Sequence, residues 1–363
     1  MATLFDYLDW RGDITFGEVG LNEVDSLILS MICYIDFDGI VPEKHDEKSI
    51  QLLAAARQYL RNHKGEQAYL GAILPPTLVT LLAKAAKTKR FGTLRLCGYV
   101  NRVNPETQIQ FSALTYLLGN QNIYVSYRGT DDTLVGWKEN FNMSFMEAVP
   151  AQLEAVKYLE KAAAIAQGGI YTGGHSKGGN LAVYATTKCS PETKEKIIMT
   201  YNNDGPGFSR NFISAPDYQS IKGKIRTLVP ESSIVGMLLE HEETYEVVKS
   251  VQVGIMQHDS FSWEVLGSKF IHLNTISDES RKIDRTLKNW LNEMDSKQRE
   301  DFVEAVYETL IATNASTLTD ISTDKIKLLR AWNGLSEENR AIVMKSIRLL
   351  FKENLKLRKP KKK

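Results

Sequence analysis

An alternation of strand-like and helix-like segments between residues 169 and 229 limits the fold of this chain more than any other feature. Strand-like GIYTGG is followed by helix-like KGGNLAVYATTK, strand-like KIIMTYNN, a short helix near SRNFIS and strand-like KIRTLV. Strands and helices that alternate in this way form a parallel sheet with helices on both faces. The chain is therefore expected to have an α/β fold with a mostly parallel sheet.

The region before residue 169 adds elements to this sheet. β-Branched and aromatic runs at 93–103, 108–118 and 122–130 have the length of strands and are separated by the short turns NPET and GNQN. Helix-forming composition predicts helices at 46–60, 76–89 and 151–166. We therefore expect adjacent strands, flanked by helices, on the N-terminal side of the alternating segment.

Strand-like runs stop after about residue 275, and apolar residues then recur at helical spacing. We expect an α/β domain over residues 1–275 and a helical C-terminal region over 276–363 that packs against it. Seven of the last twelve residues are basic, a pattern typical of a solvated terminus that makes at most weak contact with anionic surfaces.

Charge and cysteine content exclude several classes of protein. With 45 basic and 44 acidic residues, the net charge of +1 provides no overall field that would attract nucleic acid. The longest apolar run, at 26–35, is far shorter than the roughly 18 residues that suggest a membrane span. Three widely separated cysteines without metal or redox spacing, and an N-terminus unlike a secretory signal, predict a cytoplasmic protein without disulfide or zinc. The sequence does not indicate an oligomeric state.

Ser176 lies in the run Gly174-His175-Ser176-Lys177-Gly178, which matches G-x-S-x-G. This motif indicates a nucleophile only where a strand turns sharply into a helix, because the strained turn lifts the serine hydroxyl above the sheet. The predicted strand before Ser176 and the glycine-rich helix start after it supply that context. We expect Ser176 to be a nucleophile; the alternative is a small residue in a tight structural turn.

A serine nucleophile needs a base to accept its proton, and in this fold the histidine follows the serine and the acid in the chain. His258 lies on a polar interruption after an apolar run, as expected of a loop beyond the last strands of the sheet. His241 lies in a charged stretch expected to be exposed, and His272 has the alternation of an ordinary strand position. His258 is therefore the predicted base.

Two carboxylates are candidates for the acid that orients the histidine. Asp204 directly follows the next strand after the serine, at a Gly-Pro-Gly turn, and is preferred; Glu231 follows the strand after that. Asp204 would otherwise order its own turn, and Glu231 would otherwise be a solvated charge. Asp259 is adjacent to His258 and poorly placed to reach the far ring nitrogen, so it is not a candidate.

The oxyanion of an acyl-transfer intermediate needs two backbone N–H donors, one after the nucleophile and one after an earlier strand. Lys177 and Thr130 occupy these positions, and Gly129 frees the backbone before Thr130. The residues after Thr130 are candidates for a cover over the site. The alternative is a plain strand-end turn in which Arg128 forms a structural ion pair.

Several of these motifs occur in the order seen in a known family. YRGT with a nearby tryptophan, GHSKGG and a later Gly-Pro turn resemble the class 3 lipases of the α/β-hydrolase superfamily. The N-terminal block LFDYLDWRGDITFGEVGLNEVDSLILSMICYIDFDGIV, with NDGPGF and PESSIVGM, resembles more specifically a bacterial family of lipase-like hydrolases. The resemblance covers about residues 1–275 and implies an α/β-hydrolase fold and a cytoplasmic serine hydrolase with Ser176 as nucleophile.

The resemblance has one departure, at the position of the acid. Where class 3 lipases have their catalytic aspartate, this chain has Ser233, so Asp204 resembles instead the aspartate of lipases that follows the strand after the nucleophile. We expect a serine hydrolase that cleaves an acyl or lipid ester through an acyl-enzyme, without metal or cofactor. A thioesterase, a peptidase and a non-catalytic binding protein of the same fold remain alternatives.

Overall fold

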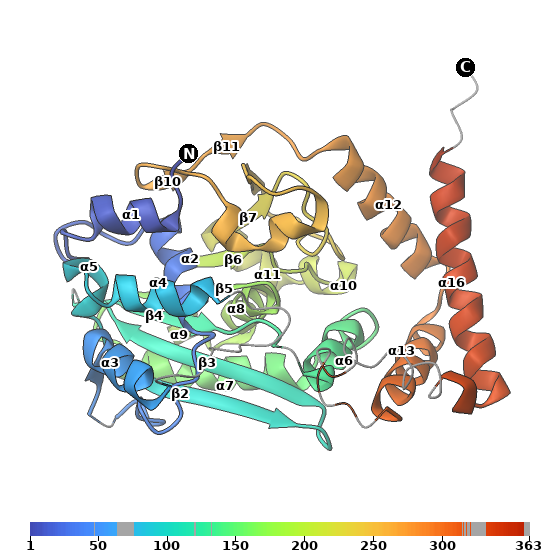
Figure 1. Ribbon diagram of the computed structural model, residues 1–363, viewed down its shortest axis with the longest axis horizontal. Coiled ribbons are helices and arrows are strands. Elements are labelled where there is room, and N and C mark those ends of the chain that lie inside the picture. The colour runs from blue at the N-terminus through green and yellow to red at the C-terminus, as the bar shows by residue number, and fades with distance from the viewer. Residues whose placement is uncertain are drawn as a thin grey trace.

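The computed structural model describes residues 1–358, apart from 47, 64–75, 120, 132, 314, 316, 318–319 and 321–331, and describes side chains as far as residue 349. Its centre is a nine-stranded sheet with the order β1-β2-β3-β4-β5-β6-β7-β8-β11 (Figure 1). The strands are β1 Ile50–Gln51, β2 Arg95–Asn104, β3 Ile109–Leu117, β4 Ile123–Tyr127, β5 Ile170–His175, β6 Ile197–Asn203, β7 Ile225–Pro230, β8 Tyr245–Val248 and β11 His272–Leu273. A separate hairpin pairs β9 Val265–Leu266 with β10 Lys269–Phe270.

Parallel pairing is confined to the centre of the sheet, from β4 to β8. The pairs β1–β2, β2–β3, β3–β4 and β8–β11 are antiparallel, so the sheet is mixed where the sequence predicts a mostly parallel one. The difference follows from the connections, because the short turns that join β2, β3 and β4 reverse the chain, whereas helices cross over between β4, β5, β6 and β7. The predicted strands at 93–103, 108–118 and 122–130 are confirmed as β2, β3 and β4.

The N-terminal helices cover one face of the sheet. They are α1 Leu4–Arg11, α2 Glu23–Ile32, α3 Leu52–Asn62, α4 Thr77–Ala85 and α5 Lys89–Gly92. All ten residues of α2 are buried, and its N-terminus is closed by a capping box between Asn22 and Asp25. Strand residues such as Tyr116 and Tyr124 belong to the same apolar cluster as these helices. The helix predicted at 46–60 is partly confirmed, because α3 begins only at Leu52, after the two-residue strand β1.

A second layer of helices covers the other face. The helices after β4 are α6 Leu134–Asn142, α7 Pro150–Ile165, α8 Lys177–Lys188, α9 Pro191–Lys196, α10 Arg210–Ile213 and α11 Pro216–Ile221. An apolar cluster joins α7 and α8 to the strands through alanines and leucines of the helices and through Val125, Tyr127 and Ile170 of the sheet. Short 3₁₀ turns follow at Lys222–Lys224, Gly254–His258 and Ser260–Ser262. The predicted α/β architecture, with helices on both faces, is confirmed.

The C-terminal region is helical, with α12 Asp278–Asn292, α13 Ser296–Ile311 and α16 Glu337–Arg358 beside the body (Figure 1). Polar contacts join it to α6 and to the segment after α6: Lys138 Nζ lies 2.7 Å from Glu304 Oε1, and Arg299 Nη1 donates to the Ser144 carbonyl at 2.6 Å. No described helix is long and apolar enough to cross a membrane. The basic tail of the sequence prediction lies outside the described side chains.

Candidate active site

Ser176 occupies the turn between β5 and α8, with φ 58° and ψ −133°. These angles lie in a region that residues other than glycine rarely adopt, so the turn is strained. Gly178 lies directly against the end of β4, because a side chain there would overlap the Tyr127 carbonyl group. The local sequence therefore produces the sharp strand-to-helix turn that presents the Ser176 hydroxyl.

His258 and Asp204 are joined by a hydrogen bond of 2.6 Å between Nδ1 and Oδ2. Asp204 directly follows β6, has φ 53° and is fully buried, whereas the side chain of His258 keeps 24% of its surface exposed at the end of a 3₁₀ turn. With Nδ1 occupied by the carboxylate, Nε2 is the ring nitrogen left to exchange a proton with a serine hydroxyl. The structure thus brings the predicted base together with the preferred acid.

The second oxygen of Asp204 receives two further hydrogen bonds. Ser233 Oγ donates to Oδ1 at 2.5 Å, and the Gly236 N–H donates to the same oxygen at 3.2 Å. Ser233, which lies three residues after β7, is buried against this carboxylate at the end of the neighbouring strand. The side chain of Glu231 is partly exposed and has no hydrogen bond to His258 among the described residues.

A second histidine, His175, packs against His258 and contacts its backbone carbonyl. Its Nε2 lies 2.9 Å from the His258 carbonyl, and the centroids of the two imidazole rings are 4.6 Å apart. Burial, together with the proximity of His258, holds the pKa of His175 well below its usual range, so the ring is neutral. Tyr34 Oη donates to the His175 carbonyl at 3.3 Å. The sequence reasoning missed this role, although a histidine beside the nucleophile was its visible signal.

Ser176 follows a residue that contacts His258, but within the described part of the chain it has no hydrogen bond of its own to the His258 ring. His175, which precedes Ser176, contacts His258 through both its ring and its Nε2 atom. Among the described residues, no hydrogen bond joins the Ser176 hydroxyl to the His258 ring. Nucleophile and base are commonly separated in an unliganded site and approach when a substrate binds.

The loop after β4 lies directly against the serine turn. An added side chain at Gly129 would come within 2.6 Å of the His175 carbonyl oxygen and 3.2 Å of Ser176 Cβ. Thr130 follows in this loop, and Asn140 Nδ2 donates to its hydroxyl at 2.6 Å. Arg128 pairs with Asp131 at 3.0 Å, as the structural interpretation of that residue predicts. Both segments predicted to supply oxyanion donors therefore meet beside the serine.

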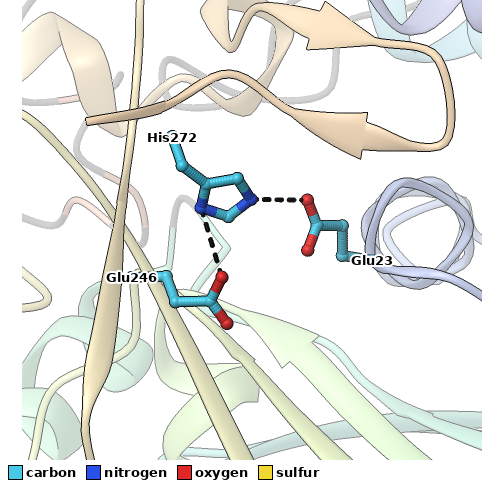
Figure 2. A group of neighbouring side chains, drawn as sticks. All are labelled: Glu23, Glu246 and His272. Atoms are coloured by element: carbon cyan, nitrogen blue, oxygen red, sulfur yellow. Dashed lines mark hydrogen bonds and ion pairs between the residues drawn. The ribbon is translucent and has the colours of Figure 1, made fainter. Parts of the chain in front are cut away.

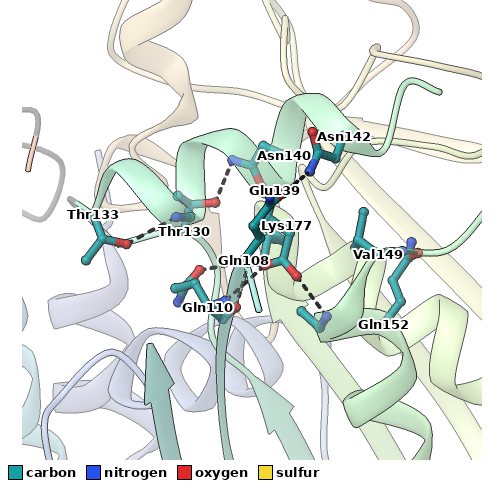
Figure 3. A network of polar contacts seen from close by, with 12 residues as sticks. Gln108, Gln110, Thr130, Thr133, Glu139, Asn140, Asn142, Val149, Gln152 and Lys177 are labelled. Carbon is teal, nitrogen blue, oxygen red and sulfur yellow. Dashed lines mark hydrogen bonds and ion pairs between the residues drawn. The ribbon is translucent and has the colours of Figure 1, made fainter. Parts of the chain in front are cut away.

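The side chain of Lys177 reaches into a buried polar network that includes Gln110 and Glu139 (Figure 3). Its Nζ donates to Glu139 Oε2 at 2.6 Å and to the backbone and side-chain oxygens of Gln110 at 2.7 and 2.8 Å. Burial lowers the pKa of Lys177, and the Glu139 carboxylate opposes that effect. The ammonium group of Lys177 thus has structural hydrogen-bond partners, whereas the backbone N–H of the same residue lies in the turn after Ser176.

The two other histidines considered lie elsewhere. His272 is in β11, as predicted. His241 was expected to be exposed, but its side chain is only 6% exposed and its Nδ1 lies 3.0 Å from Glu243 Oε1. The sequence prediction failed because the local run of charges does not reveal this buried partner. Asp259, excluded as the acid, caps the following 3₁₀ turn by accepting a hydrogen bond from the Phe261 N–H at 3.1 Å.

One group among the described residues has the composition of a metal site: Glu23, Glu246 and His272, with ligand atoms within 4.8 Å of one another (Figure 2). His272 Nε2 lies 2.9 Å from Glu23 and Nδ1 lies 3.2 Å from Glu246. Arg226 forms ion pairs with both carboxylates. Because a guanidinium group already neutralises both acids, this arrangement is an ion-pair network that joins α2 to β7, β8 and β11.

The described residues thus combine an α/β sheet, a serine at a strained strand-to-helix turn and a hydrogen-bonded Asp–His pair. The Mbeg1-like family model matches residues 85–308, more than half of the chain, and the chain belongs to this lipase-like family.

Among solved structures, the chain is similar to the native Rhizomucor miehei lipase propeptide complex at 15% identity and a TM-score of 0.34. That match covers 52% of this chain and 64% of the lipase chain. No curated protein matches the sequence.

Proposed function

We propose that this protein is a serine hydrolase of the α/β-hydrolase fold that cleaves carboxylic esters through an acyl-enzyme. The observation that carries the proposal is the 2.6 Å hydrogen bond between His258 and Asp204, beside the strained turn of Ser176. Membership of a lipase-like family supports the same class of reaction. The α/β-hydrolase domain would comprise residues 1–275, and 276–363 would be its helical appendage.

In the proposed reaction, His258 Nε2 takes the proton of the Ser176 hydroxyl while Oγ forms a bond to the ester carbonyl carbon. The carbonyl oxygen becomes an oxyanion held by the N–H groups of Thr130 and Lys177. The C–O bond of the ester then breaks, and His258 returns the proton to the departing alcohol. Water attacks the acyl-enzyme in the same manner, releases the carboxylic acid and restores Ser176, while Asp204 orients the imidazole throughout.

Exposed apolar side chains directly before His258 support an acyl or lipid ester as substrate. Val251, Val253, Ile255 and Met256 are between 54% and 77% exposed. An apolar surface of this kind is suited to contact a hydrocarbon chain rather than a charged substrate. We also propose a cytoplasmic location, which the three free and buried cysteines support.

A fluorophosphonate probe tests the proposal, because it labels a serine only when the hydroxyl is activated. We expect labelling of the wild-type protein and none of Ser176→Ala, with both proteins equally folded by circular dichroism. Failure to label the folded wild-type protein would favour a binding protein of the same fold. A chain-length series of p-nitrophenyl esters, compared with thioester and amide substrates, then distinguishes esterase from thioesterase and peptidase.

A further inference from the structure

The side chain of Gln110 connects the serine turn to the loop after β4. Gln110 lies near the start of β3 and is fully buried. Its Oε1 accepts a hydrogen bond from Lys177 Nζ at 2.8 Å, and its Nε2 donates to the Gly129 carbonyl at 3.3 Å. One amide group therefore bridges the residue after the nucleophile and the residue before Thr130.

Lys177 determines which way this amide faces. An ammonium group has three donors and no acceptor, so the amide oxygen of Gln110 must face Lys177 and the NH₂ group must face Gly129. Glu139 keeps the ammonium in place through its 2.6 Å ion pair, and Gln110 adds its own carbonyl at 2.7 Å (Figure 3). The direction of the Gln110 amide is thus fixed by charge.

The Gly129 carbonyl and the Thr130 N–H belong to the same peptide group. In a planar trans peptide, C=O and N–H point in opposite directions, so a hydrogen bond that holds the carbonyl also sets the direction of the N–H. Gln110 holds the Gly129 carbonyl from one side. The Thr130 N–H consequently points to the opposite side of the loop, while Gly129 itself lies against His175 and Ser176.

A second contact secures the other end of Thr130. Asn140 Nδ2 donates to the Thr130 hydroxyl at 2.6 Å, and Asn140 follows Glu139 in α6. Two successive residues of one helix therefore hold the two segments of the proposed oxyanion site: Glu139 holds Lys177, and Asn140 holds Thr130.

We propose that Gln110 is a positioning residue that aims the Thr130 N–H at the oxyanion, with Lys177 and Glu139 setting the orientation of its amide. This inference rests on the proposed serine hydrolase function. It gives the buried lysine of GHSKGG a role in the reaction that its backbone position alone does not explain.

Gln110→Glu tests the inference in the full-length protein. The substitution keeps volume and the oxygen that faces Lys177, but it replaces the donor to Gly129 by an oxygen that repels the carbonyl. We expect kcat for a p-nitrophenyl ester to fall about 10- to 100-fold, with KM within about twofold, because only the transition state carries the oxyanion. The inhibition constant of benzeneboronic acid, whose adduct with serine is tetrahedral and anionic, should rise by a similar factor.

Gln152→Glu is the matched control. Gln152 is also a buried glutamine that uses both ends of its amide: Oε1 accepts from the Val149 N–H at 3.0 Å and Nε2 donates to Asn180 Oδ1 at 2.8 Å. The control therefore introduces the same chemical change at another buried amide, one that has neither the Lys177 ammonium nor the Gly129 carbonyl as a partner. We expect its kcat to remain within about threefold of the wild-type value. Gln110→Met, which removes the donor without adding charge, provides a second test if Gln110→Glu fails to fold.

The outcomes separate this inference from the proposed function. If the wild-type protein reacts with fluorophosphonate and both folded Gln110 variants keep kcat within twofold, the inference about Gln110 is wrong and the hydrolase proposal stands. A loss that appears in KM, with kcat and boronate inhibition unchanged, also overturns it. If the folded wild-type protein has neither labelling nor esterase activity, both proposals are wrong.

Discussion

Ser233 Oγ donates a 2.5 Å hydrogen bond to Asp204 Oδ1, opposite the oxygen that accepts from His258. The two residues come from the ends of neighbouring strands, Asp204 after β6 and Ser233 after β7. A serine that follows one strand thus supplies a hydroxyl to the carboxylate that follows the adjacent strand. Ser233 and Asp204 together form one structural arrangement at this edge of the sheet.

Loss of the Ser233 hydroxyl should weaken catalysis without abolishing it. A hydrogen bond to a charged group contributes about 1.5–3 kcal/mol, and part of that free energy keeps Asp204 aligned with His258. We expect Ser233→Ala to lower kcat about tenfold in an ester hydrolysis assay. Ser233→Thr keeps the hydroxyl and should retain most of the activity; equal losses in both variants would mean that packing, not the hydrogen bond, matters.

Replacing the acid should have a far larger effect. Asp204→Asn keeps the shape but removes the charge that stabilises the imidazolium, and the corresponding change in a serine protease triad lowers kcat about 10⁴-fold. We expect a loss of about 10³- to 10⁴-fold here, measured as kcat on a p-nitrophenyl ester. Glu231→Gln changes the other candidate carboxylate and should leave kcat within about twofold. The reverse ranking of these two variants would assign the role to Glu231.

The strain at Ser176 makes a prediction about stability rather than activity. At φ 58° and ψ −133°, glycine has no steric cost, whereas any side chain with a Cβ does. We expect Ser176→Gly to be more stable than Ser176→Ala by about 1 kcal/mol in urea unfolding. Both variants lack the hydroxyl and should be inactive. Identical free energies of unfolding for the two variants would show that the backbone of the turn is not strained.

His175 should make stability depend on pH. Its pKa is held well below 6.5 in the folded protein by burial, so below that pH the unfolded chain takes up a proton that the folded protein does not. Unfolding then becomes easier by about 1.4 kcal/mol for each pH unit. The contribution of the neutral His175 to the free energy of unfolding is fully present above pH 6.5 and is lost progressively as the pH falls below that value.

His175→Gln isolates this effect, because other titrating groups are unchanged. From about pH 7 to pH 5.5, we expect the free energy of unfolding to fall about 1 kcal/mol further in the wild-type protein than in the variant. Urea unfolding at the two pH values measures both quantities. Parallel losses in the two proteins would contradict a neutral, buried His175.

Arg90 provides a test of the N-terminal layer. Its buried guanidinium donates to Asp25 and to the carbonyls of Ile14, Thr15, Val19 and Gly20, so it holds the loop between α1 and α2. Arg90→Met leaves the Asp25 carboxylate buried without its cation, and we expect unfolding to become easier by about 3–5 kcal/mol. The control Lys89→Met breaks an exposed pair with Glu18 and should leave the free energy of unfolding nearly unchanged in the same assay.

The parts of the site that sequence could predict are those fixed by the local chain and its order. The turn at Ser176 depends on the strand before it and the glycines after it; Asp204 follows at the end of β6 and His258 in a later loop, in the expected order along the chain. The strands β5, β6 and β7 and the helices α7 and α8 also depend on local pattern, so they lie close to their predicted bounds, whereas α9 and α11 were not predicted.

The remaining contacts depend on tertiary packing. Lys177 meets Gln110 across 67 positions of the chain and Glu139 across 38, and no spacing rule joins residues so far apart. The burial of His241 was missed for the same reason, since its local sequence is charged and its surroundings come partly from β7. The antiparallel pairing of β11 with β8 was not predicted, because local alternation indicates a strand but not its partner or direction.

Glu23, buried in the N-terminal helix α2, also affects how the protein is made. Its partners Arg226, Phe270 and His272 lie more than two hundred positions later, and Phe270 and His272 are separated from it by 247 and 249 positions. While residues 1–225 are being synthesised, this carboxylate has none of these partners and must stay in water. The Glu23 end of α2 can therefore be buried with its full set of partners only after β7 and β11 have been made, which makes this contact a late step in the assembly of the sheet.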